Sequence, residues 1–148
     1  MRKIACFTLV ILLFASLFSC QSEVSALDVA MTLKYMGKIS GNVYFSGAEE
    51  GSDHYIDSDM MKSLFSEDEP PENFAVILSS GIDLPYEIMI IIPQRGEDVI
   101  ELADVAERRL VLLTGDGGAA PVVTGNFIAY STVALDIDLE KTLRKIIT

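Results

Sequence analysis

The apolar and polar positions of this chain change their spacing several times, and each change marks a predicted element. The first element is a run of fifteen residues without a charge, Ile4 to Phe18, which follows Met1-Arg2-Lys3. A cationic start before an apolar run is typical of a secretory leader. Fifteen residues reach only about 22 Å as a helix, whereas a membrane span needs roughly twenty apolar residues. We therefore expect a leader and not a permanent membrane helix.

Strict alternation of apolar and polar residues begins at Leu27 and predicts a half-buried β-strand. Its apolar face would consist of Leu27, Val29, Met31, Leu33 and Tyr35. Ser40-Gly41-Asn42 is a turn signal, and a second short strand is expected from Val43 to Ser46. These two strands are predicted to form a hairpin.

Two more strands are predicted in the middle of the chain, from Phe74 to Ser79 and from Tyr86 to Ile92. The second strand contains Ile88-Met89-Ile90-Ile91-Ile92, a run that shows no alternation. Such a run is typical of a strand that is covered on both faces. We therefore expect it to be a central strand of the sheet.

The last third of the chain predicts two helices and further strands. Glu97 to Arg108 has helical spacing, with an apolar face formed by Val99, Leu102, Ala103 and Ala106. Strands are expected at Leu110 to Thr114 and, as one or two segments, within Val122 to Ile137. Asp138 should cap a final helix whose buried stripe is Leu139, Leu143, Ile146 and Ile147.

The order of these elements predicts one α+β domain over residues 27–148. Its sheet should be mainly antiparallel, with about five to seven strands and two covering helices. The helix between the Tyr86 and Leu110 strands permits one parallel crossover.

Residues 47–73 form an acidic loop, with nine carboxylates and Lys62 as the only lysine or arginine. Within it, Asp57 or Ser58 should cap a short helix whose Met60, Met61, Leu64 and Phe65 reach the core. A solvated loop is the favoured interpretation. An alternative is a calcium site, because Asp53, Asp57 and Asp59 lie close enough in sequence to converge with backbone carbonyls, although their spacing does not match an EF-hand.

Two cleavage sites follow the leader. Leu17-Phe18-Ser19-Cys20 resembles the lipobox of bacterial lipoproteins, although Phe18 is larger than the residue usual at its position. The resemblance implies a signal peptide over residues 1–19, a lipid on Cys20, a tether over residues 20–26 and a membrane-anchored protein of the cell envelope. Val24-Ser25-Ala26 offers ordinary cleavage before Leu27, which would release a soluble periplasmic or secreted protein.

The cysteine pattern favours lipidation. The chain has only Cys6, inside the apolar run, and Cys20, with none in the 128 residues that follow. No intramolecular disulfide can form after cleavage, so a stabilising disulfide bond does not explain Cys20. Its position at the lipobox does.

The charge of the chain after Cys20 narrows the choice of partners. It contains nine basic and 22 acidic residues, a net charge of −13. Such an excess should repel nucleic acid and anionic head groups. We expect no nucleic-acid partner, and membrane attachment through the N-terminal lipid.

Candidate chemistry is sparse. His54 is the only histidine, and the glycine-rich run at 115–118 lacks the lysine and hydroxyl residue of a P-loop. We expect no cofactor and no enzymatic activity. The favoured function is a lipid-anchored, non-catalytic module that binds a partner protein or an apolar ligand. The alternatives are a calcium-binding surface module that uses the acidic loop, and a small envelope hydrolase that uses carboxylates.

Overall fold

The structure is a computed structural model that describes residues 24–66, 68–79, 85–115 and 119–147. The predicted leader, the lipobox, Cys20 and the tether up to residue 23 lie outside the described residues, as do the last three residues, 116–118, of the glycine-rich run. None of the helices in the described part is long and apolar enough to cross a membrane.

A five-stranded antiparallel sheet forms the centre of the molecule, with strand order β1-β2-β3-β5-β4. Its strands are β1 (Asn42–Phe45), β2 (Phe74–Ser79), β3 (Tyr86–Ile91), β4 (Val122–Val123) and β5 (Ile128–Ser131). This confirms the predicted α+β class and mainly antiparallel sheet. The parallel crossover that the sequence permits does not occur among the described strands, since every pairing is antiparallel. β3 is central, as predicted, and its Ile88 to Ile91 are at most 1% exposed.

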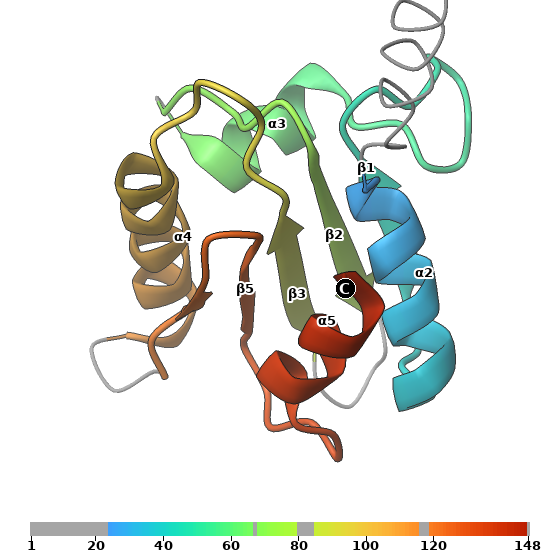
Figure 1. The fold of residues 1–148 in the computed structure, drawn as a ribbon. Coiled ribbons are helices and arrows are strands. Elements are labelled where there is room, and N and C mark those ends of the chain that lie inside the picture. Colours follow the sequence, from blue (N-terminus) through green and yellow to red (C-terminus); the bar gives the residue numbers. More distant parts are fainter. Residues whose placement is uncertain (1–23, 67, 80–84, 116–118, 148) are drawn as a thin grey trace, which may run out of the picture.

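Helices cover both faces of the sheet, so the domain has three layers (Figure 1). One outer layer contains α2 (Ala26–Gly37) and α5 (Leu139–Ile147), and the other contains α3 (Ser58–Phe65) and α4 (Val99–Thr114). Side chains alternate along each strand. In β3, Ile88 and Ile90 therefore pack toward α2 and α5, while Met89 and Ile91 pack toward α3 and α4. The described residues form four helices, where the sequence predicts two covering helices and one short one.

The predicted first strand is wrong, because residues 26–37 form helix α2. Its buried residues are Ala26, Val29, Ala30 and Leu33, which recur at the spacing of a helical face. Met31 and Tyr35 complete an apparent alternation, yet both are exposed. The segment is also rich in residues with high helix propensity and contains few β-branched ones. The hairpin predicted between this segment and β1 does not form, and β1 pairs with β2.

The predicted strand Leu110 to Thr114 is wrong as well, because α4 continues through it. Asp98 caps the helix by accepting a hydrogen bond from the backbone N–H of Ile100. Its buried residues are Leu102, Val105, Ala106 and Leu110. No glycine or proline interrupts the segment, so nothing ends the helix before Gly115.

The two remaining helices confirm their predicted caps. Asp57 accepts from the backbone N–H of Met60 at the start of α3, and Asp138 accepts from Lys141 at the start of α5. In α3, Leu64 and Phe65 are buried, and Met60 and Met61 are partly buried against the same core. The long strand region at 122–137 consists of only β4 and β5 and ends at Ser131.

Candidate functional site

An open groove lies between the C-terminal end of α4 and the nearby end of the sheet, with a volume of about 670 Å³. This size is within the range of small-molecule sites. Its apolar and aromatic lining residues are Tyr44, Leu78, Pro85, Tyr86, Leu113 and Val133. The uncharged polar ones are Asn42, Ser79, Thr114 and Thr132, and Glu87 is the one charged lining residue among those described. We call this feature the α4 groove.

The α4 groove exists because α4 stops covering the sheet before the helix ends. Leu110 is the last residue of α4 that is buried, and Val111, Leu112 and Leu113 are 40%, 69% and 43% exposed. The sheet continues beneath this turn, where Tyr44 and Leu78 remain partly buried. An apolar helix end and an apolar strand surface therefore face a space that no described helix fills.

Glu87 is bound by two side chains from neighbouring elements. Both of its carboxylate oxygens accept from the Arg109 guanidinium of α4, at 3.1 Å from Nε to Oε1 and 2.7 Å from Nη2 to Oε2. The Tyr130 hydroxyl of β5 donates to the same Oε1. Glu87 is only 5% exposed, and it is the one buried charged residue in the part of the chain that the structure describes. We call these three residues the Glu87 cluster.

The strand registers explain how the cluster assembles. Glu87 shares the α4-facing side of β3 with Met89 and Ile91, and Met89 is paired with Tyr130 across the β3–β5 ladder. Arg109 precedes the buried Leu110 on α4. Its Nη1 also donates to the carbonyl of Ser63, which links α4 to α3.

The electrostatics of the cluster keep its proton donors protonated. The hydrogen bond to Glu87 raises the pKa of Arg109 above its usual value, against the lowering effect of burial. Burial raises the pKa of Tyr130 far above its ordinary range, and the neighbouring Glu87 charge raises it further. Each oxygen of Glu87 already accepts from a guanidinium nitrogen or a hydroxyl. The cluster is therefore a closed ion pair at the edge of the groove, in which both oxygens of Glu87 are bound by donors.

The described lining residues of the groove therefore provide contacts and few reactive groups. General acid–base hydrolysis by carboxylates needs two acidic groups that face the substrate. Glu87 is the only acidic residue among the described residues that line the groove. Apolar walls with a few hydroxyl and amide groups are typical of sites that bind small ligands.

The structure does not gather the predicted calcium ligands into a site. Asp57 caps α3, Asp59 is exposed in the first turn of that helix, and Asp53 is exposed in the preceding loop. Within the described ranges, no three His, Cys, Asp or Glu side chains are placed to hold a metal ion. His54 is hydrogen-bonded through Nδ1 to the carbonyl of Val43, at 2.7 Å, which holds the loop against β1. Cys20 lies outside the described residues.

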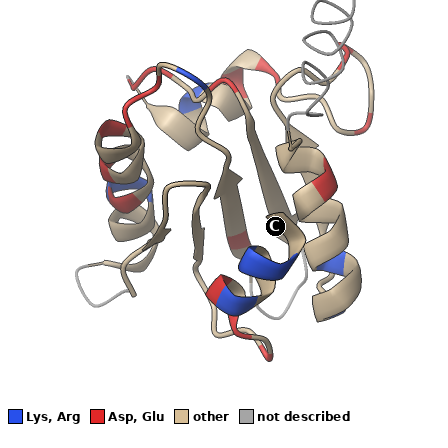
Figure 2. Cartoon of the chain, in the orientation of Figure 1, with Lys and Arg blue, Asp and Glu red and all other residues tan. Residues whose placement is uncertain are grey.

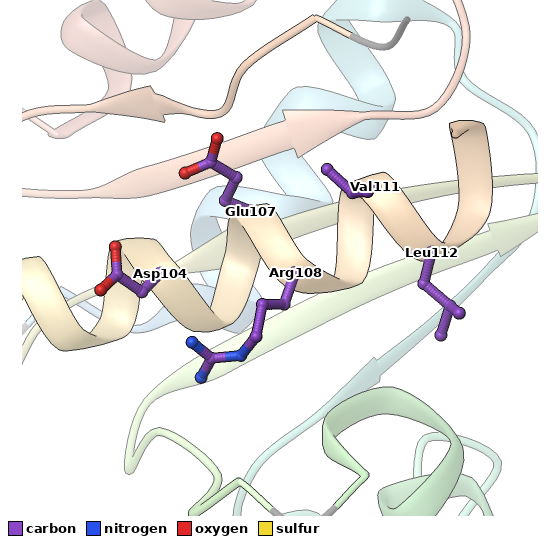
Figure 3. Close-up of a pocket in the computed structure, with 5 residues that line it drawn as sticks. All are labelled: Asp104, Glu107, Arg108, Val111 and Leu112. Atoms are coloured by element: carbon purple, nitrogen blue, oxygen red, sulfur yellow. The ribbon is translucent and has the colours of Figure 1, made fainter. Parts of the chain in front are cut away.

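A second hollow, of about 440 Å³, lies on the outer surface of α4. Figure 3 shows that its lining residues all come from this one helix, so it has no opposite wall: Asp104, Glu107, Arg108, Val111 and Leu112. Arg108 forms an exposed ion pair with Asp68 at 2.8 Å. This surface is a weaker candidate than the α4 groove, whose walls belong to several elements.

Sequence reasoning missed the Glu87 cluster, although one signal was present. Glu87 is the only charge in the segment from Tyr86 to Ile92, which was predicted to be covered on both faces. A buried charge needs a partner, because leaving it unpaired is energetically costly. The segment alone does not identify Arg109 or Tyr130 as the partners, since they are 22 and 43 residues away.

Comparisons with known proteins do not add to this picture. No family model matches the chain, and no curated protein or solved structure matches it either. Function is therefore inferred from the residues and geometry of the chain itself.

Proposed function

We propose that this protein is a lipid-tethered domain of the bacterial cell envelope that binds an apolar ligand in the α4 groove without catalysis. The observation that carries the proposal is the contrast between the groove's apolar walls and the single charged residue among its described lining residues. Glu87 is already bound by Arg109 and Tyr130. A ligand therefore meets apolar surface and neutral polar groups.

The lining residues indicate the kind of ligand. Leu78, Leu113 and Val133 offer aliphatic contacts, and Tyr44 adds an aromatic surface. Burying apolar area contributes about 25 cal/mol per Å², so an aliphatic chain would gain affinity along these walls. Asn42 and Thr132, which are separated by β2 and β3, provide a polar group at each side of the groove. A small amphiphile with an aliphatic body fits this arrangement.

The tether is supported by the way the start of the domain is held. The Asn73 side chain donates to the carbonyl of Val24, and its Oδ1 accepts from the backbone N–H of Ala26, both at 2.9 Å. Ala26 is 0% exposed, and the carbonyl of Ser25 accepts from Val29 in the first turn of α2. Cleavage before Leu27 would remove all of these contacts and place a new ammonium group beside the core. Cleavage before Cys20 retains them.

Mass spectrometry of the native protein tests the tether. The expected mature chain begins at Cys20 and carries a diacyl or triacyl adduct on that residue. An unmodified chain that begins at Leu27 would contradict the tether, because it lacks both the lipid and the residues that Asn73 holds.

A pair of tryptophan reporters tests the groove, since the chain has no tryptophan of its own. Leu113→Trp places the reporter in the groove, and Leu112→Trp places it on the outer surface of α4, one residue earlier. Titration with decanol and decanoic acid should shift the tryptophan fluorescence emission of Leu113→Trp until the shift saturates. The emission of Leu112→Trp should not change. Equal responses, or a lack of response at Leu113→Trp, would contradict ligand binding in the groove.

A further inference from the structure

The outer surface of α2 carries an unusual set of exposed side chains near its C-terminal end. Met31, Tyr35 and Met36 are 47%, 87% and 49% exposed, and Lys34 and Lys38 lie beside them. We call these five residues the α2 patch. Lys34 donates through Nζ to the carbonyl of Gly41, which holds its ammonium group on this surface.

The composition of the α2 patch is typical of segments that lie in a membrane interface. Tyrosine places an apolar ring beside a polar hydroxyl, and lysine extends its charge beyond an apolar stem. Interfacial helices combine such side chains with apolar residues that enter the boundary between head groups and acyl chains.

The charge distribution also distinguishes this layer from the rest of the molecule. Residues 24–38 and 132–147, which contain α2 and α5, hold five basic and four acidic residues. The other eighteen acidic residues after Cys20 are accompanied by only four basic ones. Figure 2 shows basic positions on α2 and α5, whereas α4 carries mainly acidic ones. A net charge of −13 for the chain after Cys20 conceals one layer that would not be repelled by an anionic surface.

Chain length brings the α2 patch within reach of the bilayer. Five residues lie between Cys20 and Ala26, and the six extended steps from one to the other span at most about 3.6 Å each, or about 22 Å in total. The twelve residues of α2 add about 18 Å. A lipid on Cys20 therefore keeps the whole of α2 close to the membrane surface.

We propose that the α2 patch docks on the anionic lipid surface to which the protein is tethered. Met31, Tyr35 and Met36 enter the interface, and Lys34 and Lys38 contact lipid phosphates. The inference rests on the proposed lipid tether and adds an orientation to it. Because α2 and α4 lie on opposite sides of the sheet (Figure 1), this docking places α4 on the side of the sheet that is away from the membrane.

Depth-dependent quenching tests this orientation in the mature lipidated protein. The protein is reconstituted into vesicles of phosphatidylethanolamine and phosphatidylglycerol whose acyl chains are brominated. Tyr35→Trp should be quenched, and Leu112→Trp, on the opposite layer, should keep the emission that it has in vesicles without bromine. Unquenched Tyr35→Trp on protein that floats with the vesicles would overturn the proposal.

A charge test separates docking from proximity caused by the tether. The Lys34→Gln/Lys38→Gln variant in the Tyr35→Trp background should associate with the surface roughly thirtyfold more weakly, since each basic residue near an anionic surface contributes about a fivefold factor. Phosphatidylcholine vesicles should likewise reduce the quenching. Unchanged quenching in both experiments would overturn the role of the lysines. Failure of the tether itself would appear differently, as loss of flotation without a Cys20 adduct.

Discussion

The two faces of the sheet bury different kinds of side chains. Toward α2 and α5, the described core contains only apolar side chains, among them Leu33, Ile77, Ile90 and Leu143. Toward α3 and α4, an apolar core of similar size ends at the Glu87 cluster, where a charged pair and a tyrosine hydroxyl are enclosed. One face is a plain hydrophobic core, and the other joins a core to a polar network.

The difference follows from how far each helical layer extends over the sheet. The last turn of α4 leaves the surface beyond Leu110 uncovered, and the Glu87 cluster lies where that cover ends. A carboxylate at such an edge needs partners, which Arg109 and Tyr130 supply. The face with incomplete cover is therefore also the face with a groove. The buried polar network and the open groove therefore occur together in this fold.

Breaking the Glu87 cluster should have the largest effect on stability. Arg109→Met removes the cationic partner of Glu87. Removing one member of a buried ion pair commonly lowers the free energy of unfolding by about 3 to 5 kcal/mol. Arg108→Met is the matched control, because its pair with Asp68 is exposed and such pairs contribute about 1 kcal/mol or less. Urea denaturation of both variants measures the difference.

Replacing all three residues of the cluster sharpens the same test. Glu87→Leu/Arg109→Met/Tyr130→Phe should recover most of the stability lost in Arg109→Met, since apolar side chains of similar volume can replace a buried ion pair without net loss and no hydroxyl is left without its acceptor. Equal stability of Arg109→Met and Arg108→Met would show that the Glu87 cluster is not effectively buried.

The opposite face should respond to lost volume and not to lost charge. Leu143 of α5 is 0% exposed within the apolar core, and Leu143→Ala should lower the free energy of unfolding by about 2 to 5 kcal/mol. Lys145→Ala, on the exposed side of the same helix, should change it by about 0.5 kcal/mol or less. Thermal denaturation compares the two variants, and an unchanged melting temperature for Leu143→Ala would mean that α5 does not stabilise the core.

The parts of the fold that the sequence predicts correctly are those determined by local pattern. Ile88 to Ile91 form an uninterrupted apolar run. Successive side chains of a strand point to opposite faces of the sheet, so such a run places apolar residues on both faces and predicts that both are buried. Asp57 and Asp138 precede helical spacing, and their short side chains reach the free backbone N–H groups of the first turn.

The two incorrect secondary-structure predictions occur where apolar residues lie on exposed surfaces. Met31 and Tyr35 made residues 27–35 look like a strand, and Val111 to Leu113 did the same at the end of α4. Periodicity identifies an element only if apolar residues are buried. Both misread segments contribute to the proposed surfaces, the α2 patch and the α4 groove. Exposed apolar residues obscured the secondary structure and also indicate where contacts are expected.

The candidate site could not be predicted from the sequence for a different reason, which is that its residues meet only in the tertiary structure. Tyr44 and Leu78 approach Leu113 only after β1 and β2 pair and α4 packs on their sheet. These contacts join residues that are far apart in sequence, so no local spacing indicates them. The lipobox, in contrast, is a contiguous motif, and the lipidation of Cys20 remains a prediction from sequence.

The smallest expected effect concerns Tyr130 and depends on pH. Tyr130→Phe removes the hydroxyl that donates to Glu87, and loss of a hydrogen bond to a charged group should lower the free energy of unfolding by about 1.5 to 3 kcal/mol at neutral pH.

At alkaline pH this difference should shrink, because burial and Glu87 raise the pKa of Tyr130 in the folded state. An unfolded tyrosine ionises near pH 10, so above this pH the unfolded chain releases a proton that the folded chain retains. The stabilisation is fully present below pH 10 and is lost as the pH rises further, and Tyr130→Phe cannot show this loss. Denaturation of wild type, Tyr130→Phe and the exposed control Tyr35→Phe across this range measures the trend. A constant gap between wild type and Tyr130→Phe would contradict the raised pKa, and with it the closed cluster at the edge of the groove.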